Sequence, residues 1–135
     1  MERTRYAGGC FCGAVRYEAS GAPRNLCYCH CESCRRAAGS PVVAWGTFDR
    51  SAFRVTHGAL AEFHSSAPVT RGFCAACGSC LTYRHEARAA EIDVTLTTLD
   101  EAAQLAPQMH VWVADKLGWV KIEDGLPQFP GTASG

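Results

Sequence analysis

The chain has 135 residues, of which 47% are hydrophobic and 19% are charged, and thirteen Lys and Arg residues balance thirteen Asp and Glu residues. This length favours a single domain, and the apolar content is enough for a packed core, which excludes a disordered chain. The zero net charge argues against a general affinity for nucleic acid or for an anionic membrane. No apolar run is long enough for a membrane-spanning helix.

Most of the chain has the alternation and β-branched content that are typical of short strands. Residues 14–19, for example, place Val15 and Tyr17 on one face and charged residues on the other. In chain order, strands are predicted at residues 3–7, 14–19, 25–28, 42–48, 51–56, 61–64, 70–73, 81–84, 91–97 and 110–113. The fold class is therefore mainly β.

Helical signals are few. Residues 32–38 are predicted to form a short helix, because Gly39 and Pro41 just beyond them are typical stop signals. One or two further helical turns are expected at residues 100–105. Strands 51–56 and 61–64 are expected to pair around His57 and Gly58. We expect one domain over residues 1–128, and the Pro- and Gly-rich end favours a flexible tail at 129–135.

Nine cysteines are unusual in a chain whose amino terminus has no apolar signal-peptide segment. We therefore expect a cytoplasmic protein, in which dense cysteine indicates metal binding before disulfides. Cys10, Cys12, Cys74 and Cys77 form a C-x-C pair and a C-x-x-C pair, each followed by glycine. Either spacing can direct two sulfurs toward one ion, so together the pairs predict a closed structural zinc site that joins the start of the chain to its middle.

The middle cysteines, Cys29, Cys31 and Cys34, supply only three thiols. Three protein ligands leave one tetrahedral position for a substrate, which is typical of a catalytic zinc site. The start of the predicted helix near Cys34 would also favour a thiolate. Cys27 or His30 remain alternative fourth ligands that would make this site structural, and Cys80 is a rival ligand beside Cys77.

These motifs resemble those of the glutathione-dependent formaldehyde-activating enzyme family and of the related centromere protein V domain. The resemblance extends from about residue 5 to residue 128. It is carried by Gly9-Cys10-Phe11-Cys12-Gly13, Arg16-Tyr17, Cys29-His30-Cys31-Glu32-Ser33-Cys34-Arg35-Arg36, Phe73-Cys74-Ala75-Ala76-Cys77-Gly78, His110-Val111-Trp112-Val113, Trp119 and Asp124-Gly125-Leu126-Pro127.

The resemblance implies stacked antiparallel sheets of the β-tent type, shared with a zinc-bearing GTPase-associated chaperone. It also implies two zinc ions per chain, a structural one on Cys10, Cys12, Cys74 and Cys77 and a catalytic one on Cys29, Cys31 and Cys34. The implied activity is that of a carbon–sulfur lyase, which adds glutathione to formaldehyde to give S-hydroxymethylglutathione.

Two alternatives stay open at this point: a non-catalytic, zinc-stapled scaffold for a protein partner, and an enzyme of the same fold with a different thiol. His30, Tyr83 and His85 are candidate helpers in proton transfer, and none is assigned a role. Arg35 and Arg36 are candidates for pairing with substrate carboxylates, although such a pair more often faces solvent. Seven aromatic residues are expected to line the core or a cavity, namely Trp45, Phe48, Phe53, Phe63, Phe73, Trp112 and Trp119. The oligomeric state is not predicted.

Overall fold

The computed structural model describes residues 4–133, which form two β-sheets and one α-helix. The smaller sheet has the order β1-β2-β5 and the larger sheet the order β10-β3-β4-β9-β8-β7-β6. The strands are β1 (Arg5–Gly9), β2 (Arg16–Ser20), β3 (Arg24–Cys29), β4 (Val43–Asp49), β5 (Phe53–His57), β6 (Ala61–Ser66), β7 (Val69–Phe73), β8 (Cys80–His85), β9 (Glu91–Thr95) and β10 (Met109–Val111).

The single α-helix, α1 (Glu32–Ala38), has the bounds that the sequence predicts. Cys31 caps its first turn in an extended conformation, and Gly39 ends it with a left-handed backbone at φ 62°. Short 3₁₀ turns make up the remaining helical structure, at Arg50–Ala52, Glu86–Arg88, Leu96–Thr98, Ala102–Gln104 and Val113–Asp115. The turn at Arg50–Ala52 shortens the strand expected at 51–56, and the turn at Leu96–Thr98 shortens the strand expected at 91–97. The turn at Ala102–Gln104 lies within the helical turns expected at 100–105.

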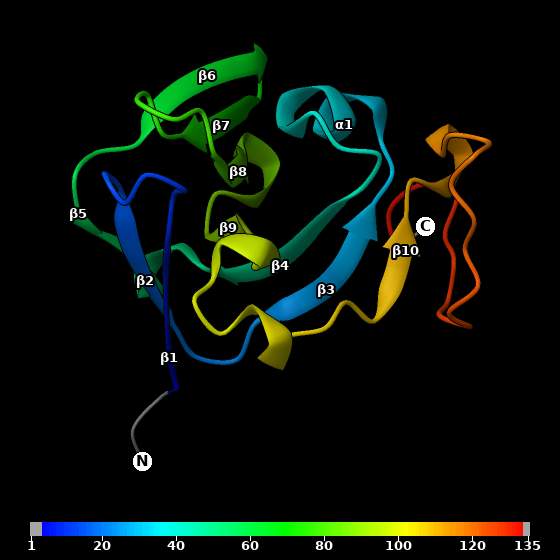
Figure 1. Cartoon of the computed structure of the whole chain (residues 1–135), viewed down its shortest axis with the longest axis horizontal. Coiled ribbons are helices and arrows are strands. Elements are labelled where there is room, and N and C mark those ends of the chain that lie inside the picture. The colour runs from blue at the N-terminus through cyan, green and yellow to red at the C-terminus, as the bar shows by residue number, and fades with distance from the viewer. Residues whose placement is uncertain (1–3, 134–135) are drawn as a thin grey trace.

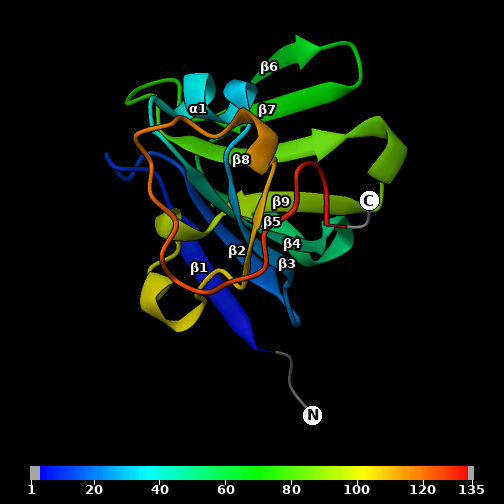
Figure 2. The same cartoon turned by 90° about the vertical axis from the view of Figure 1, so that its right-hand side faces the viewer.

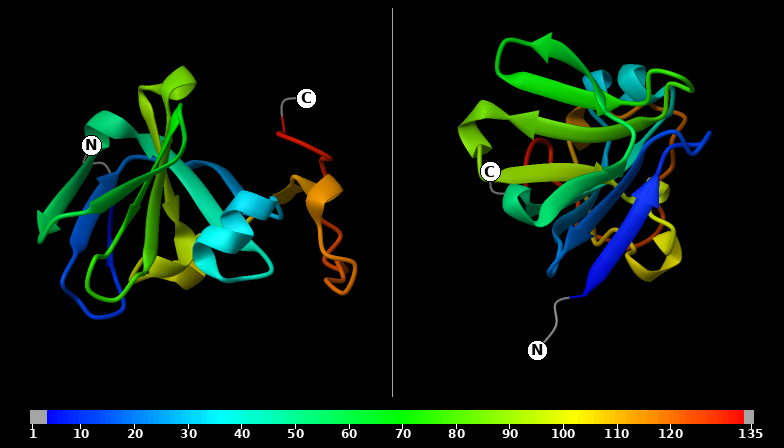
Figure 3. Two further views of the ribbon diagram at one scale, coloured as in Figure 1. Left: turned by 90° about the horizontal axis from the view of Figure 1, so that it is seen from above. Right: turned by 90° about the vertical axis from the view of Figure 1, so that its left-hand side faces the viewer.

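The strand pairs are antiparallel except for β10, which lies parallel to β3. Figure 1 shows β1 and β2 on the left of the larger sheet, and β10 with the carboxyl-terminal segment on the right. The view from above in Figure 3 keeps this separation, with α1 between them. The mainly β fold predicted from the sequence is thus confirmed.

The larger sheet carries a buried cluster on each face. Along β4, Ala44 and Phe48 belong to one cluster while Val43 and Trp45 belong to the other, since alternate residues of a strand point to opposite faces. The first cluster also contains Tyr17 and Ala19 of β2 and Val15 just before that strand. The second cluster contains Cys29 and Cys34. The two cysteine groups therefore lie in different environments.

The predicted pairing of residues 51–56 with 61–64 is wrong. β5 pairs with β2 and β6 pairs with β7, so these consecutive strands belong to different sheets. Gly58 has a left-handed backbone at φ +73°, and a Cβ built there would lie 2.0 Å from the carbonyl oxygen of Ala14. The chain thus passes tightly against residue 14 on its way to the other sheet, a path that local patterning does not reveal.

The carboxyl-terminal segment lies along the outer side of β10, as Figures 1 and 2 show, and its Phe129 packs against the second cluster. Phe129 donates its N–H to the carbonyl of His110 at 2.9 Å, and Trp112 donates to Gly131 at the same distance. The beginning of the expected tail at 129–135 is therefore hydrogen-bonded to the body, while its mobility and the single domain over 1–128 stay predictions. The first residue of the strand predicted at 3–7 and the last two of the tail lie outside the described residues.

Within residues 4–133, no helix has both the length and the apolar character needed to cross a bilayer.

Candidate metal centres

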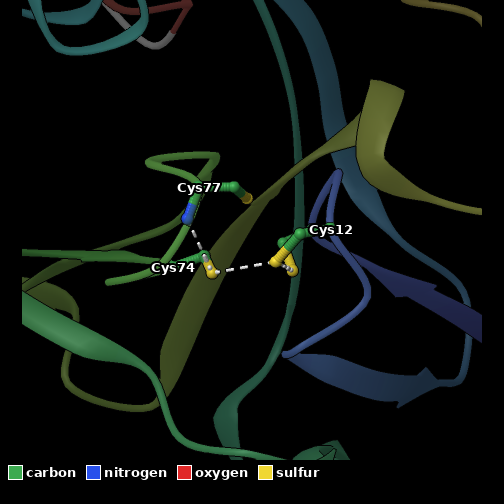
Figure 4. Close-up of side chains that lie close together, drawn as sticks. Cys12, Cys74 and Cys77 are labelled. Atoms are coloured by element: carbon green, nitrogen blue, oxygen red, sulfur yellow. Dashed lines mark hydrogen bonds between the residues drawn. The ribbon is translucent and has the colours of Figure 1, made fainter.

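The first cysteine group lies where two loops meet. Cys10 and Cys12 come from the loop between β1 and β2, and Cys74 and Cys77 come from the loop between β7 and β8. Figure 4 shows Cys12 facing Cys74 across the junction, with Cys77 beside them. We refer to these four residues as the four-thiol cluster. It brings Cys12 into contact with Cys74, which is 62 residues away in the sequence.

The spacing of the four sulfurs suits one tetrahedral zinc ion. The Sγ atoms of Cys10 and Cys12 are 3.7 Å apart, those of Cys12 and Cys74 are 3.8 Å apart, and all four lie within 4.8 Å of one another. Zinc–sulfur bonds of about 2.3 Å place neighbouring sulfurs roughly 3.8 Å apart. All nine cysteines are free thiols, so no disulfide competes for these sulfurs.

Backbone and hydroxyl groups around the four-thiol cluster are directed at its sulfurs. The N–H of Val15 donates to Cys10 Sγ at 3.2 Å, and the N–H of Cys77 donates to Cys74 Sγ at 3.4 Å. The hydrogen bonds of Ser79 lower the pKa of Cys77 to about 5. Gly78, with φ +80°, lets the chain turn back after Cys77. These contacts favour thiolates, the form in which cysteine binds a metal.

The second group, the three-thiol cluster, consists of Cys29 at the end of β3, Cys31 before α1 and Cys34 in its first turn. Their sulfurs also lie within 4.8 Å of one another. The cap of α1 creates this geometry, because the N–H of Cys34 donates to the Sγ of Cys31 at 3.3 Å. Cys29 and Cys34 are each only 5% exposed, whereas Cys31 is partly exposed.

Three thiols this close cannot all ionise without a cation. Proximity to Cys29 lowers the pKa of Cys31, and proximity to Cys31 raises the pKa of Cys29. Such opposed shifts arise when like charges share one site. A divalent ion removes the repulsion, so the donor set fits a soft metal such as zinc.

The structure does not bring a fourth described thiol into this cluster. Cys27 and Cys80 pack near it but lie outside the group of convergent sulfurs. Burial raises the pKa of Cys27 to about 12 and also raises the pKa of Cys80. The geometry therefore gives no support to a fourth cysteine ligand.

His30 lies outside the group of convergent sulfurs and contacts a second imidazole instead. Its Nε2 is 2.8 Å from Nδ1 of His110, whose Nε2 is 2.7 Å from a carboxylate oxygen of Asp124. With both rings neutral, His110 donates to Asp124 and accepts from His30. His30 is 1% exposed, its burial lowers its pKa, and its Nδ1 is left without a partner among the described residues.

The other helpers considered from the sequence are dispersed. Tyr83 packs against the second buried cluster of the larger sheet, but His85 is at the surface, where its Nδ1 accepts from the N–H of Ala87. Arg36 pairs with Glu32 along α1 at 3.0 Å. Arg35 donates to the carbonyl of His30 at 3.4 Å, which leaves it next to the cluster.

Two features near the three-thiol cluster escape sequence reasoning. Arg71 of β7 reaches Cys34, although nothing in its local sequence distinguishes it from the surface arginines. The link from His110 to Asp124 is the other feature. His110 and Asp124 belong to the carboxyl-terminal motifs, which are the only sign in the sequence that these residues matter. The contact of His110 with His30 depends on the parallel pairing of β10 with β3, which the motifs do not reveal.

With this geometry established, known proteins provide an independent comparison. The sequence model of the family described as glutathione-dependent formaldehyde-activating enzyme matches residues 5–115. The chain belongs to this family. The match includes all seven cysteines of the two clusters and ends before Asp124.

Relatives of the chain agree with the family assignment. A Halomonas elongata protein that bears the provisional name of a glutathione-dependent formaldehyde-activating enzyme is 30% identical over 125 residues, which cover 86% of this chain and 80% of the relative. An uncharacterized lyase of Schizosaccharomyces pombe is 30% identical over 80 residues, or 59% of this chain and 58% of the relative.

A solved structure supports the fold alone. The crystal structure of a Rhodobacter sphaeroides protein superposes with a TM-score of 0.59 and covers 91% of this chain and 98% of its own. The two sequences are 23% identical. The likeness extends over nearly the whole of both chains.

Proposed function

We propose that this protein is a zinc-dependent carbon–sulfur lyase of the cytoplasm that adds glutathione to formaldehyde. The observation that carries the proposal is the three-thiol cluster, in which Cys29, Cys31 and Cys34 converge without a fourth described ligand. The family and the names of its relatives supply the reaction class. The four-thiol cluster is proposed to hold a second, structural zinc.

The proposed catalytic zinc would be held by three cysteines. Cys29, Cys31 and Cys34 would hold three positions around the catalytic zinc, and the partly exposed side of Cys31 leaves access for a substrate. When bound, zinc supplies a Lewis acid that keeps an incoming thiol ionised near neutral pH. Cys34, fixed in the first turn of α1, and Cys29, fixed at the end of β3, keep the donor set rigid.

The chemistry balances without an oxidant. The glutathione sulfur attacks the carbonyl carbon of formaldehyde, the C–S bond forms, and the electron pair of the C=O π bond moves to oxygen. The proton lost by the thiol reaches that oxygen through solvent, which gives S-hydroxymethylglutathione. The same addition occurs in water without a catalyst. The measure of catalysis is therefore the increase in the rate of addition over the rate in buffer alone.

The test is exchange NMR between formaldehyde and S-hydroxymethylglutathione, run with and without the zinc-loaded protein. We expect an exchange rate that rises in proportion to protein concentration and that is lost in Cys34→Ser, while the matched variant Cys80→Ser keeps it. A protein that retains two zinc ions per chain but leaves the exchange rate at its buffer value would overturn the proposal and favour a zinc-stapled scaffold.

A further inference from the structure

Arg71 is a buried arginine that joins the larger sheet to the three-thiol cluster. It lies on β7, is 6% exposed, and places both terminal nitrogens 3.8 Å from the Sγ of Cys34. Its Nε donates to the hydroxyl of Ser65 on β6 at 3.2 Å. Its guanidinium carbon lies 5.0 Å from the centre of the Tyr83 ring on β8. Three neighbouring strands therefore aim this cation at one sulfur of α1.

The charge of Arg71 has no carboxylate partner in the part of the chain that the structure describes. Other arginines form ion pairs with Asp or Glu, namely Arg16, Arg24, Arg36, Arg54, Arg84 and Arg88. Those arginines are at least partly exposed, whereas Arg71 is withdrawn from solvent. Burying an uncompensated guanidinium is costly, so a nearby negative charge is required. The side chain that Arg71 contacts in this way is Cys34, whose sulfur would be a thiolate with a metal bound.

The charge count at the cluster shows what this cation would do. Three thiolates around one Zn²⁺ sum to one negative charge, and a thiolate in the fourth position would raise this to two. In a buried site such a charge is unfavourable unless a fixed cation compensates for it. The guanidinium of Arg71 supplies one such positive charge.

We infer that Arg71 is a positioning residue that makes the three-cysteine centre selective for an anionic thiolate over a neutral fourth ligand. The inference rests on the proposed function, since it assumes a metal on Cys29, Cys31 and Cys34 with its fourth position open. The two contacts to Cys34 also hold that sulfur in place, because the planar guanidinium directs two N–H groups at it. A lysine would keep the charge but not this paired geometry.

The test is a comparison of two ligands on the cobalt-loaded full chain, followed by its visible and charge-transfer absorption. One ligand is 2-mercaptoethanol, which has no carboxylate and binds as a thiolate, and the other is imidazole at a pH where it is neutral. In Arg71→Met and Arg71→Gln we expect the apparent Kd for the thiol to rise by on the order of tenfold or more, since charge compensation is lost. The Kd for imidazole should change by less than about twofold.

Controls separate charge from structure. Arg71→Lys should recover much of the preference for the thiol, and Arg54→Met, which removes an exposed arginine paired with Glu18, should behave like the wild type. The inference is overturned if the neutral variants weaken both ligands equally or weaken neither. If the wild-type cobalt spectrum does not respond to any thiol, the proposed open site itself fails, and this result is distinct from an unchanged preference in the variants.

Discussion

The two cysteine clusters use the same ligand type in opposite ways. The four-thiol cluster joins loops distant in sequence, and Cys12 in it is exposed. The three-thiol cluster draws its sulfurs from six consecutive residues, and two of its cysteines are buried in the core cluster against which Phe129 of the carboxyl-terminal segment packs. A site that spans distant segments suits a structural role, whereas a site built from one segment can lose its metal without opening the fold.

Their surroundings differ in the same sense. Backbone N–H groups and the Ser79 hydroxyl face the sulfurs of the four-thiol cluster. The three-thiol cluster has a backbone donor too, from Cys34 to the sulfur of Cys31, and in addition a guanidinium, that of Arg71, directed at Cys34. Four thiolates around one Zn²⁺ would carry the same charge as three thiolates joined by a fourth from a substrate, but Cys12 exposes the four-thiol cluster to solvent, whereas Cys29 and Cys34 are buried and have a fixed cation beside them.

The largest expected effect comes from the four-thiol cluster. Cys74→Ser should abolish the cooperative thermal transition, because structural zinc contributes about 10 kcal/mol to folding, as much as a typical domain's whole stability. Calorimetry and circular dichroism measure this effect. A variant that melts at the wild-type temperature with both metals bound would remove the distinction between the clusters.

The next effect concerns the three-thiol cluster. Cys34→Ser should keep the fold and one zinc ion per chain, while catalysed exchange falls by more than about a hundredfold, since a direct ligand matters more than its supporting neighbours. Metal analysis and the exchange NMR experiment check this together. Unfolding of Cys34→Ser would mean that both clusters are structural.

A smaller effect is expected in the imidazole chain behind the three-thiol cluster. His110→Ala should destabilise the protein by about 1–3 kcal/mol, because it leaves the buried Nε2 of His30 without its partner. Asp124→Asn, at a more exposed carboxylate, should destabilise the protein less than His110→Ala does. Chemical denaturation of the two variants gives the ranking, and the reverse order would contradict the assignment of His110 as the central member.

The smallest effect is expected at the two remaining cysteines. Cys27→Ala and Cys80→Ala should leave metal content and exchange rate unchanged and alter the free energy of unfolding by about 1 kcal/mol or less. Loss of one zinc ion from either variant would instead identify that thiol as a fourth ligand. The three-thiol cluster would then be a closed site with four thiol ligands, like the four-thiol cluster.

Local patterns predicted much of this molecule. Helix 32–38 and both cysteine groups follow from features only a few residues apart: a stop signal, a C-x-C pair or a C-x-x-C pair. The strands followed from alternation. What local patterns missed depends on pairing between distant segments, as when β5 joins β2 instead of β6.

The same limit explains the missed side chains. Arg71 faces Cys34 only because β7 and α1 meet in space, and its neighbours in the sequence do not indicate this. His110 meets His30 only because β10 runs parallel to β3. Patterns of charge and hydropathy identify faces of strands, but they do not identify which distant strand lies next to which.

The position of β10 beside β3 has a consequence for biosynthesis. The three sulfurs of Cys29, Cys31 and Cys34 leave the ribosome early, but the residues that cover them, including Val111 and Phe129, are translated near the end. During that interval the nascent chain presents three neighbouring thiols to solvent. Metal loading at this stage would protect them from oxidation until the last strand closes over the site.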